Sequence, residues 1–320
     1  MSPAVGIALI VAPSTDLHAR AVYALLKKRG RKAAMIDVST IVCGQSAYLN
    51  CGVEEDAGAY FRSAGELIRG SNVSHVWIRR TQIPVAMFQG DELDIQLAIR
   101  ETRHLFNSLI SVGFPNAILI NDPYAEFIAR SKPLQLATAR RCGLRIPRTW
   151  FGTDVQQAAE FVRECRVRGC QVIVKHMESS AHTDLFTRVI PSDDSLYLEP
   201  LASCPAVLQE FVPGPSVRAS VVGNRIFAAE IQPSTAASKL DWRREVLPPI
   251  REIELPCVIR NKLSNLMSEL RLKMGMIDLQ MDNNGEPAFL EVNPQGQFLF
   301  VELQTKQRIC ESIANLLSPD

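Results

Sequence analysis

Two pairs of short alternating runs, each pair joined by a turn, constrain the fold of this chain more than any other feature. Residues 216–222 and 225–232 flank Gly223-Asn224, a combination typical of a two-residue hairpin turn. The runs GMIDLQM (275–281) and PAFLEVN (287–293) flank a second turn that ends at Gly285. The sequence therefore predicts an antiparallel sheet in the last third of the chain.

The first third of the chain has a different pattern of apolar residues. Val5–Ala12 is a continuous apolar run, as expected for a parallel strand buried on both faces. A helical stripe that ends at Gly30 and a second apolar run, Ala33–Val38, complete a β-α-β unit. The segment also has further strand candidates at 74–79 and 117–121 and a helix at 91–111. It contains no G-x-G-x-x-G after its first strand, so a dehydrogenase that binds its dinucleotide here is not supported.

The middle of the chain mixes helices with short strands. We expect helices over 134–142, 154–168 and 256–270, a terminal helix over 298–317, and strands over 171–176, 184–190 and 206–212. Residues 233–250, which contain the cluster DWRRE, have no clear period and are expected to form a functional loop. The predicted fold class is α/β with α+β lobes, divided into domains 1–130, 131–205 and 206–320.

Composition excludes several classes of protein. The chain has 35 Lys and Arg against 34 Asp and Glu, which argues against a protein that coats nucleic acid. No apolar run approaches the roughly 18 residues that span a bilayer, and the first residues lack the features of a signal peptide. The eight cysteines are scattered without C-x-x-C spacing. We therefore expect a reduced, cytoplasmic protein without a membrane or nucleic-acid partner.

The second predicted hairpin carries a candidate metal site. Glu291 and Asn293 are two residues apart, so their side chains leave the same face of one strand, and Asp278 lies on the neighbouring strand. Two carboxylates and an amide oxygen are suited to Mg²⁺. The alternative is an ordinary solvated strand face. The apolar surroundings in AFLEVNP and FLFVEL disfavour it, because buried charge is costly without a partner.

Two lysines are candidates for holding phosphate. Lys175 interrupts the apolar strand VIVKHM, and Lys132 opens a helix shortly after Asn121-Asp122-Pro123. A point charge on a flexible stem is a common phosphate ligand. Taken singly, each lysine could instead be an ordinary surface residue with a buried stem.

A third feature is the exit of a strand into a turn. The segment from Leu208 to Gly214, LQEFVPG, ends at Pro213-Gly214. A strand that ends in this way leaves backbone N–H and C=O groups that can read the edge of an adenine, although many strand exits look alike.

In this order and spacing, the three features resemble the ATP-grasp superfamily. The pattern is a Lys, a second Lys about forty residues later, Q-E-F, and D…E-x-N. The chain is also similar in sequence to the ATP-grasp ligases that mature ribosomally made peptides, the microviridin-type (graspetide) macrocyclases. The similar segments are HVWIRR, LDWRRE and IDLQMDNNGEPAFLEVNPQGQFLFVE. RimK-type ligases are more distant relatives. The resemblance implies an ATP-grasp fold: an N-terminal open α/β domain and two lobes that clamp ATP.

The resemblance also implies roles for the matching residues. Lys132 and Lys175 would contact ATP phosphates, Arg218 would approach the triphosphate, and Arg243 would stabilise the γ-phosphate or an acyl phosphate. The adenine pocket would be lined, partly by backbone, by Gln209, Glu210, Phe211 and Val212, and Mg²⁺ would be held by Asp278, Glu291 and Asn293. The chain departs from the family in two places: the segment after Lys175, residues 176–184, has no glycine, and Ser216 stands where a ribose-binding carboxylate is expected.

The implied reaction is ATP-dependent ligation. An Asp or Glu side chain of a precursor peptide would become an acyl phosphate, which a Ser, Thr or Lys side chain would capture to close an ω-ester or ω-amide ring. Family members recognise a helical leader segment, expected here between the N-terminal lobe and residues 184–198, and many are homodimers. No Ser/His/Asp or Cys/His arrangement offers an enzyme nucleophile; His176 and His182 are weaker site candidates.

Two other functions remain open at this stage. A RimK-like ligase, adding an amino acid or amine to a carboxylate, would share every ATP-binding residue and differ only in its acceptor. A nucleotide-sensing protein without catalysis is favoured by the glycine-free segment and Ser216, and disfavoured by the intact set of Asp278, Glu291 and Asn293.

Overall fold

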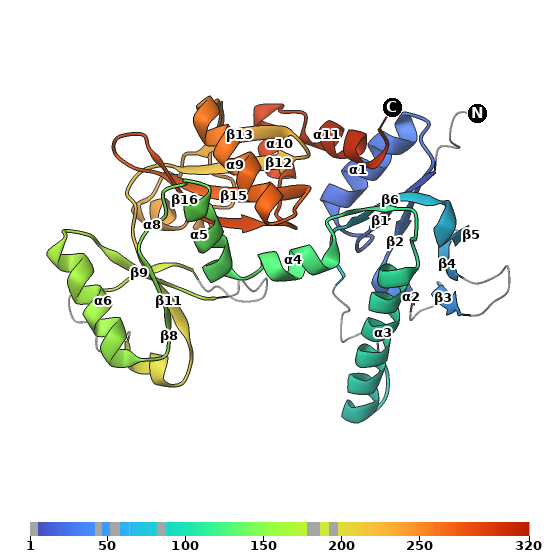
Figure 1. Cartoon of the computed structure of the whole chain (residues 1–320), viewed down its shortest axis with the longest axis horizontal. Coiled ribbons are helices and arrows are strands. Elements are labelled where there is room, and N and C mark those ends of the chain that lie inside the picture. Colours follow the sequence, from blue (N-terminus) through green and yellow to red (C-terminus); the bar gives the residue numbers. More distant parts are fainter. Residues whose placement is uncertain are drawn as a thin grey trace.

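The computed structural model describes residues 6–41, 47–51, 58–63, 65–81, 88–177, 186–191 and 198–319. In this part of the chain the strands form four sheets, and the molecule is elongated, with the N-terminal sheets at one end and the other two at the opposite end (Figure 1). Most of the segment 176–184 and His182, and most of the predicted leader-binding strands, lie outside the described residues. None of the described helices has both the length and the apolar composition needed to cross a membrane.

The N-terminal sheet is parallel, with strand order β2-β1-β6-β7, as the buried apolar runs predicted. Alternate residues of β1 enter two different cores: Ala8 and Ile10 pack with α1, and Leu9 and Val11 pack with α3. The two helices therefore cover opposite faces. The elements of this lobe are β1 (Ile7–Val11), α1 (Leu17–Lys28), β2 (Ala33–Ile36), α2 (Val38–Ile41), β6 (Val73–Ile78), α3 (Glu92–Val112) and β7 (Ile118–Ile120).

A small antiparallel sheet beside this lobe was not predicted. Its strands are β3 (Ala47–Asn50), β4 (Gly58–Ser63) and β5 (Glu66–Arg69). Ala59 and Phe61 of β4 are buried in the same core as α3. The strands are short and separated by polar segments, so their sequence pattern is too brief to indicate a sheet.

The central lobe is an antiparallel sheet, β10-β9-β11-β8, covered by one helix. Asp154 caps that helix by accepting hydrogen bonds from two backbone N–H groups, and Ala158, Val162 and Cys165 pack onto the sheet. The elements are β8 (Thr149–Gly152), α6 (Val155–Val167), β9 (Val172–Lys175), β10 (Arg188–Val189) and β11 (Ala206–Glu210).

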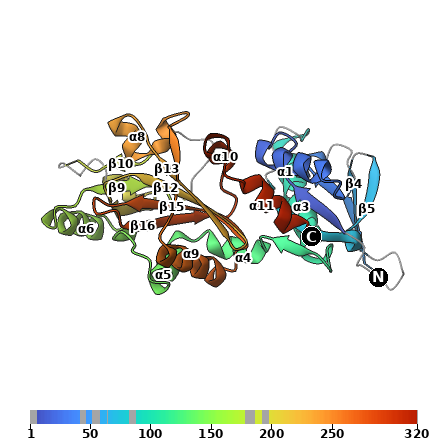
Figure 2. The ribbon, with the colours of Figure 1, turned by 90° about the horizontal axis from the view of Figure 1, so that it is seen from above.

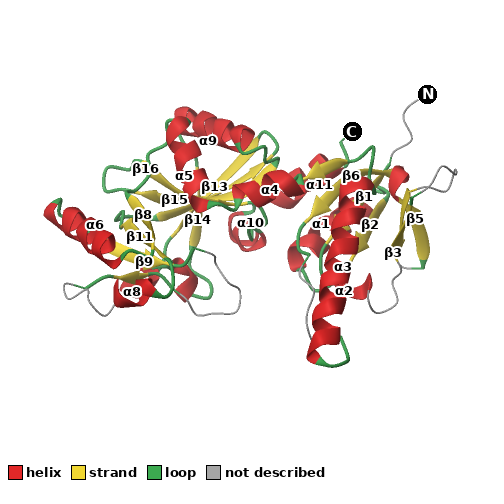
Figure 3. Cartoon of the chain, turned by 60° about the horizontal axis from the view of Figure 1, so that its bottom comes forward, coloured by secondary structure: helices red, strands yellow, loops and turns green. Residues whose placement is uncertain are grey.

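The C-terminal lobe contains the two predicted hairpins in a five-stranded antiparallel sheet, β14-β13-β12-β15-β16. Helices α5 and α9 cover one face, and α10 lies on the opposite side (Figure 3). The segment 233–250 contains only α8 and a short 3₁₀ turn at Trp242–Arg244. The elements are α5 (Lys132–Arg141), β12 (Ser216–Val222), β13 (Arg225–Ile231), α8 (Ala236–Leu240), β14 (Ile250–Ile253), α9 (Cys257–Glu269), β15 (Met274–Met281), β16 (Pro287–Asn293) and α10 (Leu299–Thr305).

Some helices pack against a different lobe from the one to which the predicted domain boundaries assign them. The boundaries themselves stay predictions. Helix α4 (Pro123–Ala129) runs between the two ends of the molecule, and α5 packs on β16 and α9 of the C-terminal lobe. The last helix, α11 (Ile309–Leu317), packs against α1, so the C-terminus returns to the N-terminal lobe (Figure 2).

The single terminal helix predicted over 298–317 is wrong. The structure has α10 and α11, and the chain between them passes through Lys306, whose φ of 63° lies in the left-handed region. Two interactions at this break are not visible in the helical period of the sequence. Glu302 accepts a hydrogen bond from the N–H of Cys310 at 2.7 Å, and the side chain of Gln307 donates to the carbonyl of Ala228 at 3.1 Å. The break lets α11 turn toward α1.

His18 of α1 joins the N-terminal lobe to α10. Its Nδ1 atom accepts hydrogen bonds from the N–H groups of Phe298 at 3.4 Å and Leu299 at 3.2 Å. Burial, together with the nearby charge of Arg79, lowers the pKa of His18 to about 4. The imidazole is therefore neutral at pH 7 and acts as a cap at the start of α10.

We expect His18→Ala to lower the free energy of unfolding by about 1 kcal/mol at pH 7, because two N–H groups lose their acceptor. The unfolded chain protonates this side chain near pH 6.5 and the folded chain does not until about pH 4. The wild type therefore loses stability as pH falls between these values, and the difference from the variant narrows. Urea unfolding at pH 7 and pH 5 measures both effects. His104→Ala, on the exposed surface of α3, is the control, and an equal loss there would contradict the capping role.

Candidate active site

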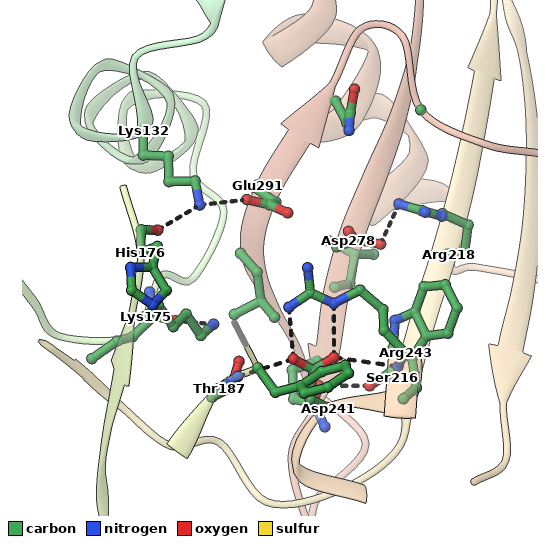
Figure 4. A pocket seen from close by; sticks show the side chains of 18 of the residues that line it. Lys132, Lys175, His176, Thr187, Ser216, Arg218, Asp241, Arg243, Asp278 and Glu291 are labelled. Carbon is green, nitrogen blue, oxygen red and sulfur yellow. Dashed lines mark hydrogen bonds and ion pairs between the residues drawn. The ribbon is translucent and has the colours of Figure 1, made fainter. Parts of the chain in front are cut away.

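A cavity of about 580 Å³ lies where the central and C-terminal sheets meet. Its wall draws on β9 and β11 from one lobe, β12, β15 and β16 from the other, and the 233–250 segment (Figure 4). Nine of the predicted site residues line it: Lys132, Lys175, Gln209, Ser216, Arg218, Arg243, Asp278, Glu291 and Asn293. Seven elements or segments, from α5 to β16, thus contribute predicted site residues to one cavity.

The predicted metal-binding residues lie side by side on the sheet. Asp278 of β15 is directly opposite Glu291 of β16, and Asn293 lies opposite Met276. A bulge follows Asp278 in this strand pair, so the strict alternation continues only on the Asn293 side. All three residues line the same cavity, and their role as metal ligands stays a prediction.

Each carboxylate has a cationic partner. Arg218 Nη1 lies 2.7 Å from Asp278 Oδ1, and Lys132 Nζ lies 3.2 Å from Glu291 Oε2. Burial raises the pKa of Asp278, and Arg218 offsets this only in part. Burial acts on Glu291 in the same direction, but the charges of Lys132 and Lys175 outweigh it and lower the pKa of Glu291. An additional cation between the two carboxylates would favour the ionised form of Asp278.

In the described part of the chain, no group of three or more His, Cys, Asp or Glu side chains could hold a metal ion. The candidate set contains only two carboxylates, and its third donor is the Asn293 amide, whose Oδ1 also accepts the N–H of Gln295 at 3.1 Å. Such an all-oxygen set suits Mg²⁺, which takes few protein ligands and completes its shell with water and phosphate.

Lys175 is anchored to the neighbouring strand. Its Nζ donates to Gln209 Oε1 at 2.8 Å, and Gln209 Nε2 donates to the hydroxyl of Thr149 at 3.0 Å. Burial lowers the pKa of Lys175 to about 8, although the charge of Glu291 raises it. The ammonium group is thus held in a fixed position and is poorly solvated, a state in which a bound anion would favour its charged form.

We expect this shift to appear as pH-dependent stability. The unfolded chain still binds this proton between pH 8 and 10.5, where the folded chain releases it, so stability rises with pH across this range. The contribution is on the order of 1–3 kcal/mol. Lys175→Met should lack it, whereas the exposed Lys28→Met should keep it. Denaturant unfolding from pH 7.5 to 10.5 measures the difference, and parallel curves for wild type and Lys175→Met would contradict the assignment.

Arg243 is held by an acidic neighbour that the sequence reading did not single out. Asp241 accepts Arg243 Nε at 2.8 Å and Nη2 at 2.6 Å, and its second oxygen also accepts the N–H of Thr187 at 3.1 Å. These bonds lower the pKa of Asp241 against the effect of its burial. Asp241 therefore joins the irregular loop to the chain that leads into β10.

Trp242 completes this corner of the cavity. The guanidinium of Arg218 lies 5.6 Å from the centre of its ring, and the ring stacks on Phe300 of α10 at 5.5 Å. The 233–250 segment was expected to be functional, and six of its residues line the cavity: the consecutive residues Leu240 to Arg243, together with Glu245 and Val246.

The predicted adenine-binding residues are only partly gathered there. Gln209 lines the cavity, but Glu210, Phe211 and Val212 are not among the described residues of its wall. The N–H groups of Glu210 and Phe211 are already bonded to the carbonyls of Arg148 and Gln171, at 2.9 and 2.8 Å. These two N–H groups are used within the sheet in this conformation, and the role of residues 209–212 in binding adenine stays a prediction. Ser216 donates to Gln280 Oε1 at 3.0 Å.

No protein-family model and no curated protein sequence matches the chain. Solved structures do. The macrocyclase MdnC from Microcystis aeruginosa MRC, bound with precursor peptide MdnA, matches over 98% of this chain and 100% of its own, with a TM-score of 0.87 and 26% identity. A RiPP-associated ATP-grasp ligase from Chryseobacterium gregarium, in complex with ADP and a leader and core peptide, matches over 98% and 96%, with a TM-score of 0.87 and 24% identity.

The chain has the ATP-grasp fold and is an ATP-dependent ligase. The expected ATP-grasp fold and the resemblance to graspetide macrocyclases are thereby confirmed. A D-cycloserine synthetase, DcsG, shares the fold more distantly, with a TM-score of 0.58 and 15% identity. The cavity between the central and C-terminal sheets is therefore the candidate active site of this ligase.

Sequence reasoning missed three residues of the ligase's cavity region. Asp241 stands two residues before Arg243. An acidic residue close to the basic pair in DWRRE was the signal in the sequence that could have identified it. Thr149 begins β8 and reaches the cavity only through Gln209. Arg80 ends the run HVWIRR and lines the wall from the N-terminal lobe.

Proposed function

We propose that this ligase uses Mg·ATP to activate Asp or Glu side-chain carboxylates of a ribosomally made precursor peptide. Ser, Thr or Lys side chains of the same peptide then close ω-ester or ω-amide macrocycles. The observation that carries the proposal is the pairing of Asp278 with Glu291 inside a cavity that also holds Lys132, Lys175, Arg218 and Arg243. The solved macrocyclases with the same fold support the choice of a peptide substrate.

Asp278, Glu291 and Asn293 would hold Mg²⁺, because they present adjacent hard oxygens on one sheet face. When bound, the ion would offset negative charge on the phosphate oxygens. Lys132 and Lys175 would contact ATP phosphates, and their present partners, Glu291 and Gln209, keep them at the cavity wall. Gln209 to Val212 and Ser216 are the proposed lining of the nucleoside pocket.

The proposed first step is attack by an oxygen of the substrate carboxylate on the γ-phosphorus of ATP, which releases ADP and leaves an acyl phosphate. Charge grows on the transferring phosphoryl oxygens, where Arg243 and Lys175 supply fixed positive charge. Arg243 can do so without reorganisation because Asp241 already holds its guanidinium by two bonds. Arg218 serves the same region from β12, held by Asp278.

In the second step a hydroxyl or amine of the peptide attacks the acyl carbon. The new ester or amide bond forms, the C–O bond to phosphate breaks, and inorganic phosphate leaves with the former carboxylate oxygen. No enzyme nucleophile takes part. The chain contributes by holding the two reacting side chains near each other in a cavity of limited size.

The partner is proposed to be a precursor peptide with a helical leader, and the ligase is proposed to act as a homodimer in the cytoplasm. A cytoplasmic site is supported by the use of ATP and by the seven cysteines in the described part of the chain, all of which are free thiols. The leader groove was predicted around residues 184–198, most of which lie outside the described part.

The test is incubation of the ligase with ATP, Mg²⁺ and the candidate precursor, a short peptide encoded beside its gene with a Ser/Thr/Lys- and Asp/Glu-rich core. Mass spectrometry should show the loss of one water for each ring. A gain of mass on adding a free amino acid would instead support the RimK-like alternative. ADP release that does not respond to peptide, with no change of peptide mass, would contradict both.

A further inference from the structure

Arg80 differs from the other cationic residues of the cavity wall. Among the described residues, the other Lys and Arg side chains that line the cavity each contact a partner oxygen within 3.2 Å: Lys132 with Glu291, Lys175 with Gln209, Arg218 with Asp278 and Arg243 with Asp241. The nearest carboxylate oxygen to Arg80 is Asp16 Oδ2, 3.6 Å from its Nε. Among the described residues, the guanidinium of Arg80 thus has no side-chain hydrogen bond and one carboxylate neighbour at 3.6 Å.

The surroundings of Arg80 carry excess positive charge. Asp16 Oδ2 also lies 3.6 Å from Nε of Arg79, so one carboxylate oxygen serves two guanidinium groups. The other oxygen of Asp16 accepts the N–H of Ala19 as the cap of α1. Asp16, Arg79 and Arg80 together carry one net positive charge at the end of β6. The carboxylate of Glu126, which also acts on Arg79, is already paired with Arg130 at 3.0 Å.

Arg79 connects Asp16 and Arg80 to the loop that follows β16. Its side chain is fully buried, and Nη1 donates to the carbonyl of Gln295, while Nε and Nη2 have no hydrogen-bond partner among the described residues. Burial lowers the pKa of Arg79 to about 10, so the side chain stays charged at pH 7. The side chain of Arg79 has no exposed surface, whereas that of Arg80 is 37% exposed and lines the cavity, as do Gln295 to Gln297.

We infer that Arg80 binds the side-chain carboxylate of the peptide residue that is to be activated. A guanidinium offers two parallel N–H donors that match a carboxylate. The cationic residues proposed for ATP lie on the central and C-terminal lobes, and Arg80 lines the same cavity from the N-terminal lobe. Its neighbour Arg79 bonds to Gln295 in the loop that follows Asn293. This placement would set a carboxylate oxygen beside the phosphate region. The inference rests on the proposed function and identifies Arg80 as the residue that selects acidic side chains.

The test uses a small probe with one side-chain carboxylate, N-acetyl-glutamate methylamide, and its neutral counterpart, N-acetyl-glutamine methylamide. Ligand-observed NMR measures binding of each to the ligase saturated with Mg²⁺ and AMP-PNP. We expect the wild type to prefer the carboxylate, and Arg80→Gln to weaken that probe about tenfold or more, as for the loss of a charged hydrogen bond. Arg80→Lys should weaken it less. Arg103→Gln, on the exposed face of α3, is the matched control.

The affinity for AMP-PNP is measured on the same samples. Equal binding of the carboxylate probe by wild type and Arg80→Gln, no preference for it over the amide, or no binding by the wild type would overturn the inference. A loss confined to nucleotide affinity would also overturn it, since it would place Arg80 on ATP. If the wild type fails to bind Mg·AMP-PNP at all, the proposed function itself fails, which is a separate result.

Discussion

Glu291→Gln is expected to lower ATP-dependent water loss from the precursor peptide by more than about 10³-fold, with the fold intact. The substitution keeps the shape of the side chain but removes its charge. Asp278 loses the anionic neighbour that would share a Mg²⁺ ion, and Lys132 loses the carboxylate that holds its Nζ at 3.2 Å. Both the metal site and the proposed phosphate-binding lysine are affected by one change.

The matched control is Glu286→Gln, in the turn of the same β15–β16 hairpin, where the side chain is exposed and outside the cavity. It should turn over at the wild-type rate. Turnover is measured by mass spectrometry of the peptide, and thermal unfolding of both variants checks the fold. Normal turnover by Glu291→Gln would contradict the metal assignment, and an equal loss in Glu286→Gln would show that the hairpin is merely sensitive to substitution.

Arg243→Ala should reduce the rate much more than nucleotide binding. We expect kcat to fall by about 10²- to 10³-fold and the Kd for ATP to change by less than about threefold. The reason is positional: Asp241 orients the guanidinium by two bonds, so its charge is fixed before phosphoryl transfer begins. A preorganised charge acts mainly where charge develops in the transition state.

Two further variants test this reading. Arg251→Ala removes an arginine that pairs with Glu230 away from the cavity, and it should leave kcat unchanged. Asp241→Asn keeps Arg243 but weakens its anchor, so kcat should fall in the same direction by a smaller factor. Single-turnover kinetics and nucleotide titration separate the two parameters. Equal losses of ATP affinity and rate in Arg243→Ala would show that the residue only binds the ground state.

The sequence predicted most of what depends on local periodicity. Both hairpins of the C-terminal sheet and the parallel first strand have clear patterns. The register that pairs Asp278 with Glu291 depends in addition on a bulge after Asp278, which the sequence pattern does not show. The break between α10 and α11 was missed because its causes are partners distant in the sequence: Gln307 reaches the carbonyl of Ala228 on β13. A helical period contains no information about such a contact.

The residues of the candidate site could also be predicted only where a local sequence pattern identifies them. Lys175 and Glu291 were identified because a charge within an apolar strand is unusual wherever the strand packs. Asp241 lies in an irregular segment and Arg80 just beyond the end of an apolar strand, where a charged residue is ordinary. Their significance appears only when three lobes meet at one cavity. The N–H groups of Glu210 and Phe211 bond to the carbonyls of Arg148 and Gln171, and this pairing on both sides of β11 cannot be read from one segment.

The most direct test of the account follows the fate of one oxygen atom. A precursor peptide whose Asp and Glu side-chain carboxylates carry a heavy oxygen isotope is incubated with the ligase, ATP and Mg²⁺, and the released phosphate is examined by mass spectrometry. Activation as an acyl phosphate predicts one labelled oxygen in inorganic phosphate for each ring formed, and none in water. Rings formed with unlabelled phosphate, or label found in AMP, would contradict it.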